Sequence, residues 1–323
     1  MLKVRDKIIS WQQILLSNLF NSLGGEMKKL FTLASLLAVA ALVLSACGGS
    51  GGSSASDLLG AIKERGYIMV SSDPNYEPQS FLNTSGTRPA DTKCPEGALT
   101  TAEMQGFDVD VAIAIGDSLG VETCFPTPAW DAITAGSWAD QWDVSVGSMT
   151  ITVERQAVLD FSVPYYGTPA VVAVPADSTA SSLEDLAGQA LCAGASTTYE
   201  TWLNGGDLGP SITVFSAAPA GVTVVSLPTD QECAQALSRG EFAGYVTAST
   251  VVDSNIADGL AVKQLGEPVF TEVLAAAFDR SSSLDTTSLR AAVDELFTAM
   301  HSDGRLTSLS EKWFGTDLTQ VSQ

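Results

Sequence analysis

Short apolar runs alternate with helical patterns along most of the chain. Runs typical of buried strands occupy 67–71, 122–126, 143–146, 171–174, 190–193, 222–226, 242–246 and 269–278. Helical periodicity or helix-start signals occupy 58–65, 107–119, 130–137, 182–186, 199–203, 229–237 and 289–300. Because strands alternate with helices through connections longer than hairpins, we predict an α/β fold with mainly parallel sheets. Ligands bind such folds at polar loops that follow the carboxyl ends of strands.

The stretch 143–166 carries the strongest binding signal. We expect a buried strand over 143–146 that ends at Gly147, followed by a short helix that Thr152 caps. Small hydroxyl residues, free backbone N–H groups and Arg155 together indicate a socket for an anion. The alternative is a plain strand–loop–helix unit with a surface arginine, and spacing alone does not separate the two.

A second loop repeats this arrangement in the other half of the chain. The strand 190–193 opens into a small hydroxyl loop that includes Thr197 and Thr198, and a helix follows it. Two such loops in different halves suggest one ligand held between two lobes.

The N-terminal region indicates export. A basic pair, Lys28 and Lys29, precedes an apolar run over 30–44 and the sequence Leu-Ser-Ala-Cys, which resembles the bacterial lipobox. We therefore expect a leader over 1–46 with its true start at Met27, and a lipid on Cys47 as the only membrane attachment. A Gly/Ser tether over 47–56 would follow. A signal anchor with an incidental cysteine is the alternative.

The composition limits the possible partners. The chain has 16 Lys+Arg against 37 Asp+Glu, a net charge of −21. Nucleic acids and anionic membrane surfaces require clustered cations, so both are excluded as partners. The acidic residues are scattered, which is typical of a solvated surface.

Four cysteines remain after Cys47, an even number in an exported chain. Three pairings are possible. We favour Cys94–Cys124 with Cys192–Cys233, since each pair lies within one half of the chain, over four buried free thiols. No spacing fits a zinc site, and we expect no metal and no cofactor.

Several segments, in order, resemble one family. The sequence Gly-Phe-Asp-Val-Asp-Val over 106–111 is similar to the signature of the bacterial extracellular solute-binding proteins, family 3. Further similarities are Asp-Pro-x-Tyr-x-Pro over 73–78, Trp-Asp-Ala-Ile over 130–133, Thr-Ile-Thr-x-Glu-Arg over 150–155 and Leu-Glu-Asp-Leu over 183–186. The resemblance covers about 57–314.

The resemblance implies a two-lobe periplasmic-binding-protein fold of type II that closes about a hinge. Lobe 1 would comprise 57–167 and 268–323, and lobe 2 would comprise 168–267. The chain would cross between the lobes near 166–170 and 265–269.

The resemblance also implies roles for individual residues. Arg155 matches the arginine that pairs with a ligand's α-carboxylate, and a planar guanidinium suits that partner. The other matching positions complete the socket, form aromatic walls or close from the second lobe: Ser148, Thr150, Tyr76, Trp130, Thr197 and Thr198.

One position departs from the family pattern. Thr247 stands where amino-acid binders usually place an aspartate that receives the ligand's α-ammonium. Either Asp73 or Glu77 substitutes for it, or the ligand has no α-ammonium.

The function expected from the resemblance is that of a monomeric, lipid-anchored, extracytoplasmic binding protein. It would deliver a carboxylate-bearing solute, an amino acid in our interpretation, to the permease subunits of an ABC importer. The alternatives are a dehydratase-like enzyme on the same fold and a ligand sensor for a membrane receptor. We expect no catalytic residues, because the only histidine, His301, is far in sequence from every pocket loop.

Overall fold

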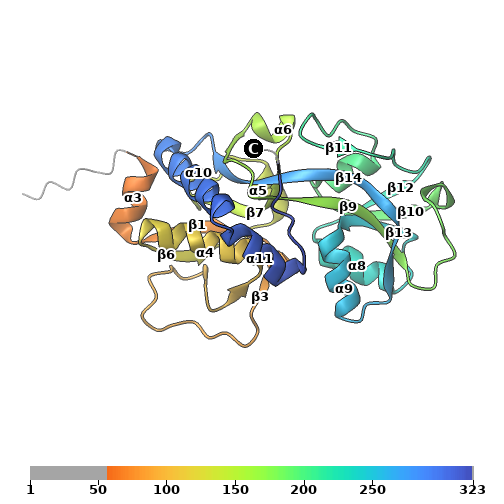
Figure 1. Ribbon diagram of the computed structural model, residues 1–323, viewed down its shortest axis with the longest axis horizontal. Coiled ribbons are helices and arrows are strands. Elements are labelled where there is room, and N and C mark those ends of the chain that lie inside the picture. The colour runs from red at the N-terminus through yellow and green to blue at the C-terminus, as the bar shows by residue number, and fades with distance from the viewer. Residues whose placement is uncertain (1–56, 322–323) are drawn as a thin grey trace, which may run out of the picture. The chain divides into compact units, whose positions relative to one another are not determined.

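The computed structural model describes residues 57–321. These residues form an α/β fold in which helices flank one large sheet of eleven strands (Figure 1). The predicted leader, the lipid attachment at Cys47 and the tether up to residue 56 lie outside the described residues. Within 57–321, none of the helices combines the length and the apolar composition that a membrane crossing requires.

The first part of the sheet surrounds β1 (Tyr67–Ser71). It contains β6 (Glu122–Phe125) and β7 (Val144–Thr150), both parallel to β1, and β4 (Leu99–Thr100) at the edge. Four helices pack here: α3 (Leu58–Arg65), α4 (Phe107–Leu119), α10 (Thr287–Ser302) and α11 (Arg305–Phe314). Their apolar faces bury one hydrophobic core, which includes Val70, Ile115 and Phe297.

The second part of the sheet surrounds β10 (Ala190–Gly194), with β12 (Thr223–Leu227) and β13 (Gly244–Ala248) parallel to it. Helices α7 (Thr198–Leu203), α8 (Asp230–Ser238) and α9 (Ser249–Ala257) cover it, and a short 3₁₀ helix spans Leu183–Leu186. This part has its own core, which includes Val172, Leu191 and Val246. Two separate cores joined by one sheet are what a two-lobe protein requires, and we call them the first and second lobes.

Two long antiparallel strands join the lobes (Figure 1). They are β9 (Tyr166–Pro175) and β14 (Val262–Asp279), and their pairing shifts register between Leu265 and Phe270. The expected crossings at 166–170 and 265–269 lie on this pair. The lobe boundaries themselves remain a prediction.

Smaller elements complete the two lobes. The short strands β2 (Asn75–Tyr76), β3 (Ser80–Leu82) and β5 (Met104–Gln105) form a separate small sheet. The remaining elements are α5 (Trp130–Thr134), α6 (Val153–Gln156) and β8 (Leu159–Phe161), together with β11 (Thr213–Val214), which pairs with β14.

Two expected strand bounds were wrong, and one helix was not expected. Strand β7 does not end at Gly147 but continues to Thr150, because β14 pairs with Met149 and Thr150 and holds that backbone extended. Strand β14 begins at Val262, seven residues before the predicted start, since β9 offers a partner over that length. Helix α9 was not predicted, because its N-cap, Ala248, provides no capping side chain.

Other local predictions are confirmed. The helix expected from 229 begins there as α8, because Thr229 and Glu232 form a capping box in which each side chain accepts the other's backbone N–H. The structure also contains the disulfides Cys94–Cys124 and Cys192–Cys233.

Candidate functional site

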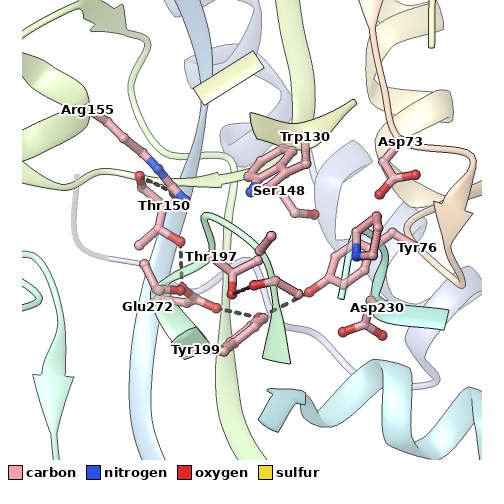
Figure 2. Close-up of a pocket in the computed structure, with 15 residues that line it drawn as sticks. Asp73, Tyr76, Trp130, Ser148, Thr150, Arg155, Thr197, Tyr199, Asp230 and Glu272 are labelled. Atoms are coloured by element: carbon pink, nitrogen blue, oxygen red, sulfur yellow. Dashed lines mark hydrogen bonds between the residues drawn. The ribbon is translucent and has the colours of Figure 1, made fainter. Parts of the chain in front are cut away.

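A cavity lies between the lobes where several strands end (Figure 2). Its walls come from the loop after β1, the end of β7, helix α6, the loop after β10, the start of α8 and the middle of β14. Eight of the nine residues expected to contact a ligand line it: Asp73, Tyr76, Trp130, Ser148, Thr150, Arg155, Thr197 and Thr198. The ninth, Thr247, does not line it.

Arg155 is held in the cavity wall by local structure. It belongs to α6, whose N-cap Thr152 accepts the Arg155 backbone N–H through its hydroxyl at 3.2 Å. Its side chain donates to the backbone oxygens of Thr150 at 3.1 Å and Ser196 at 3.0 Å, and it lies over the Trp130 ring. With only 7% of the residue exposed, Arg155 is not the surface arginine of the alternative interpretation.

The charge of Arg155 remains open to an anion. Burial lowers the pKa of its guanidinium to about 10, so the group is still cationic at neutral pH. Its two hydrogen-bond acceptors are neutral carbonyls, and none of the ion pairs among residues 57–321 includes Arg155. A carboxylate is a strong complement for such a group because the hydrogen bonds would be charge-assisted.

Two serines of the cavity region have left-handed backbones: Ser148, near the end of β7, has a φ of 54°, and Ser196, in the loop after β10, has a φ of 61°. Such angles are uncommon for residues other than glycine and concentrate at functional sites. At Ser196 this geometry turns the carbonyl oxygen toward the first lobe, where it accepts from Arg155 at 3.0 Å and from the Trp130 indole at 3.3 Å. The loop after β10 is therefore in direct contact with helices α5 and α6.

Ser148 is fixed by a buried network behind the cavity. Its backbone N–H donates to the Tyr165 hydroxyl at 3.1 Å, and its own hydroxyl donates to Asp108 at 2.6 Å and meets the Tyr166 hydroxyl at 2.5 Å. The N–H and hydroxyl expected to contact the ligand are thus engaged within the protein. Burial raises the pKa of Asp108 to about 7, and its hydrogen bonds from Ser148 and Tyr165 oppose that rise.

Three acidic side chains line the cavity, and the sequence motifs indicated only Asp73 among them. Asp73 accepts from the Asn75 backbone at 2.9 Å, and burial raises its pKa. Asp230, the first residue of α8, accepts from Tyr245 at 2.6 Å and Thr247 at 2.7 Å, and burial raises its pKa to about 7. Glu272, on β14, is the third.

Glu272 connects residues of both lobes. Its carboxylate accepts from the Thr150 hydroxyl at 2.5 Å, the Thr198 hydroxyl at 2.9 Å and the Tyr199 hydroxyl at 2.7 Å (Figure 2). Only 2% of the residue is exposed, and this burial raises its pKa. No motif in the sequence marked Glu272, because it reaches the cavity through the pairing of β14 with β9. Tyr199 was also missed, although it directly follows Thr198 in the first turn of α7.

The aromatic residues close the cavity from both sides. The Tyr76 hydroxyl from the first lobe lies 3.0 Å from the Tyr199 hydroxyl of the second lobe. Nearby, the Gln79 amide donates to the Thr250 hydroxyl at 2.6 Å. These direct contacts show that the described arrangement is a closed one.

Thr247 and Glu77 lie outside the cavity. Thr247 is completely buried behind Asp230, to which its hydroxyl donates, so Asp230 separates it from the space where a ligand would lie. Glu77 lines a neighbouring hollow with Asn75 and Asp258. Of the two acids expected to substitute at the amine end, only Asp73 lines the cavity.

Comparison with known proteins places the chain among binding proteins. The L-cystine-binding protein TcyJ of Escherichia coli K12 is 30% identical over 274 residues, which cover 81% of this chain and 88% of TcyJ. A probable amino-acid ABC transporter-binding protein of Haemophilus influenzae is 24% identical, over 88% of this chain and 99% of the relative.

Solved structures have the same fold. The ancestral amino-acid-binding protein AncCDT-1, described as a precursor of cyclohexadienyl dehydratase, is 26% identical with a TM-score of 0.64, and the match covers 79% of this chain and 99% of that protein. The family model for bacterial extracellular solute-binding proteins, family 3, matches residues 68–316. By this match and its two-lobe fold, the chain belongs to the bacterial extracellular solute-binding proteins, family 3.

Proposed function

We propose that the protein is the substrate-binding component of an ABC importer and that it binds an amino acid between its two lobes. The observation that carries this proposal is Arg155, a buried cation in the cavity wall whose hydrogen bonds go only to two backbone carbonyls. The ligand's α-carboxylate would bind there, and the facing loop that contains Ser196 would close over it. The names of the relatives support an amino acid as the solute and an ABC transporter as the partner.

The cavity walls define the remaining contacts in this proposal. Tyr76 and Trp130 would flank the ligand, and Thr197 and Thr198 would approach it from the second lobe. Hinge bending between the lobes would open and close the site. A lipid on Cys47 would hold the protein, as a monomer, at the outer face of the membrane beside the permease subunits.

Calorimetric titration of the purified protein with the twenty common amino acids and L-cystine tests this proposal. Arg155→Ala should weaken binding about 30-fold to several thousand-fold, because truncating one partner of a buried, hydrogen-bonded charge pair costs about 2–5 kcal/mol. Arg155→Lys keeps the charge but loses the two-pronged geometry, and it should also bind weakly. Arg239→Ala is the control, since Arg239 is exposed and pairs with Glu241.

Undiminished binding by Arg155→Ala would contradict the carboxylate assignment. Absence of binding by the wild type to every amino acid tested would contradict the proposed function itself.

One observation favours a second candidate, a dehydratase-like enzyme. Asp230 has a pKa of about 7 and lines the cavity, and a general acid or base near neutrality needs such a pKa. Both of its oxygens, however, already accept hydroxyl hydrogen bonds from Tyr245 and Thr247, which fits a fixed binding group better. Turnover of a cyclohexadienyl carboxylate by the wild type, lost in Asp230→Asn, would establish the enzyme.

A further inference from the structure

We infer that Glu272 binds the α-ammonium group of the ligand and so supplies the negative charge that Thr247 cannot. This inference rests on the proposed function, because it assumes an amino acid whose carboxylate binds Arg155. It identifies a specificity-determining residue on β14, outside the short motifs on which the family resemblance was based.

The first argument is distance. The ammonium and the carboxylate of an α-amino acid are bonded to the same carbon atom, so their two binding groups must be neighbours. A single residue links Arg155 to Glu272: the Thr150 backbone oxygen accepts from Arg155 at 3.1 Å, and the Thr150 hydroxyl donates to Glu272 at 2.5 Å. Figure 2 shows Glu272 on the same side of the cavity as Arg155 and Thr150.

The other two cavity acids lie elsewhere. Figure 2 shows Asp73 and Asp230 on the opposite side, beyond Tyr76. Asp73 bonds to Asn75, and Asp230 bonds to Tyr245 and Thr247, so neither shares a partner with Arg155. These two acids are placed to contact the ligand's side chain and not its α-carbon substituents.

The second argument is hydrogen-bonding capacity. A carboxylate accepts about four hydrogen bonds, and Glu272 receives three from neutral hydroxyl groups, two on Oε2 and one on Oε1. Oε1 therefore retains an acceptor position. All three donors are hydroxyls, which rotate about their C–O bonds and are able to yield to a charged donor.

The third argument is charge. Only 2% of Glu272 is exposed, and no cation among residues 57–321 forms an ion pair with it. A buried carboxylate without a directly bonded cation is costly, whereas a paired one is not. Burial raises the pKa of Glu272, and the charge of Arg155 opposes that rise without a direct ion pair between them. An ammonium at this position would add a directly bonded cation while Arg155 binds the ligand's carboxylate.

The donors to Glu272 also connect binding to closure. Thr150 belongs to the first lobe, Thr198 and Tyr199 begin α7 in the second, and Glu272 lies on one of the two strands that join them. An ammonium on Glu272 would add a contact at the point where these three parts meet. Weak ammonium binding would then also weaken closure.

The test compares amino acids with the corresponding acids that lack the α-amino group. The probes are amino acids with one ammonium group at the α-carbon, each with its des-amino partner: L-methionine with 4-(methylsulfanyl)butanoate, L-arginine with 5-guanidinopentanoate, L-glutamine with 4-carbamoylbutanoate, and L-histidine with 3-(imidazol-4-yl)propanoate. Affinities are measured by calorimetry on the full chain and on Glu272→Gln, with Asp230→Asn as the matched control.

We expect the wild type to prefer the amino acid strongly over its des-amino partner. Glu272→Gln should bind the amino acid about 30-fold to 1,000-fold more weakly, as expected for removal of one partner of a buried charge pair. Its affinity for the des-amino acid should stay within a few-fold of the wild type, which also shows that the variant is folded. Asp230→Asn should keep the preference.

A preference retained by Glu272→Gln, or lost in Asp230→Asn, would overturn the inference and leave the proposed function intact. Failure of the wild type to bind any of the four amino acids would refute the proposed function as well. A crystal structure of the wild type with the bound amino acid decides the matter without a variant: we expect the ammonium nitrogen on Glu272, and its placement on Asp73 or Asp230 would refute the assignment.

Discussion

The free energy of unfolding should decrease between pH 5 and pH 8, and replacing Asp108 with asparagine should abolish much of that decrease. Asp108 lies in the first turn of α4, is completely buried, and accepts hydroxyl hydrogen bonds from Ser148 and Tyr165 at 2.6 and 2.7 Å. Burial raises its pKa from 3.8 to about 7. Asparagine has the same shape, and its amide oxygen and nitrogen reproduce the acceptor and donor of a protonated carboxyl group.

The direction of the effect follows from the two pKa values. Below pH 3.8 the group is protonated in both the folded and the unfolded chain, so it contributes nothing to pH dependence. Between about pH 4 and pH 7 the unfolded chain releases the proton while the folded protein retains it. The free energy of unfolding therefore decreases as pH rises through this window and levels off above pH 7.

The magnitude follows from the same values. Each pH unit in the window costs about 1.4 kcal/mol, so the full cost is about 4 kcal/mol. Part of this cost has already developed at pH 5, which leaves about 3 kcal/mol between pH 5 and pH 8. Asp108→Asn lacks the titrating group, so its free energy of unfolding should decrease by about 3 kcal/mol less than that of the wild type between pH 5 and pH 8.

Urea unfolding at pH 5 and pH 8 measures this difference directly. The control is Asp117→Asn, which makes the same change at an exposed position of the same helix and leaves the buried network intact. Asp230 and Glu272, whose pKa values burial also raises, contribute in the same direction in wild type and variant alike. Identical pH dependence in the wild type and Asp108→Asn would show that Asp108 is ionised in its buried network, and the reasoning would fail.

Two further predictions concern the framework that holds the site. Gly106→Ala should lower the free energy of unfolding by about 2–4 kcal/mol, because Gly106 has a φ of 133° and a Cβ there would overlap the backbone of Gln79. Gly120 is the control: it is also left-handed but has open space around it, so Gly120→Ala should cost only about 1 kcal/mol. Equal costs for the two variants in urea unfolding would contradict the steric argument. Replacing Cys192 and Cys233 together by serine should cost about 4 kcal/mol, because their bond closes a loop with a sequence separation of 41. Thermal unfolding of this variant that matches the oxidised wild type would show that the bond does not stabilise the second lobe.

The sequence predicted those features of the site that depend on neighbours along the chain. The cap that Thr152 provides for α6, and with it the position of Arg155, requires residues only three apart. The capping box of Thr229 and Glu232 is equally local. Most of the motif positions from Asp73 to Thr198 reach one cavity because they lie in the last residues of a strand or shortly after it, and strands are recognisable from hydrophobic patterning.

The sequence could not reveal the residues that reach the cavity through long-range pairing. Glu272 lies 122 positions from Thr150, and it faces the cavity only because β14 pairs with β9 in one register, which places Glu272 opposite Thr168. A shift of one residue would turn its side chain to the other face of the sheet. Similarly, Asp230 could be identified as the first residue of a helix, but not as a wall of the cavity in front of Thr247.

The sequence therefore determined the family, the two-lobe α/β fold and the position of Arg155, because these depend on periodicity, capping and motifs within short segments. Only the tertiary structure decided which carboxylates accompany Arg155 and which polar groups of Ser148 are already engaged. That choice depends on sheet order, register and burial, which bring together residues 40 positions apart at Ser148 and Asp108 and 122 positions apart at Thr150 and Glu272.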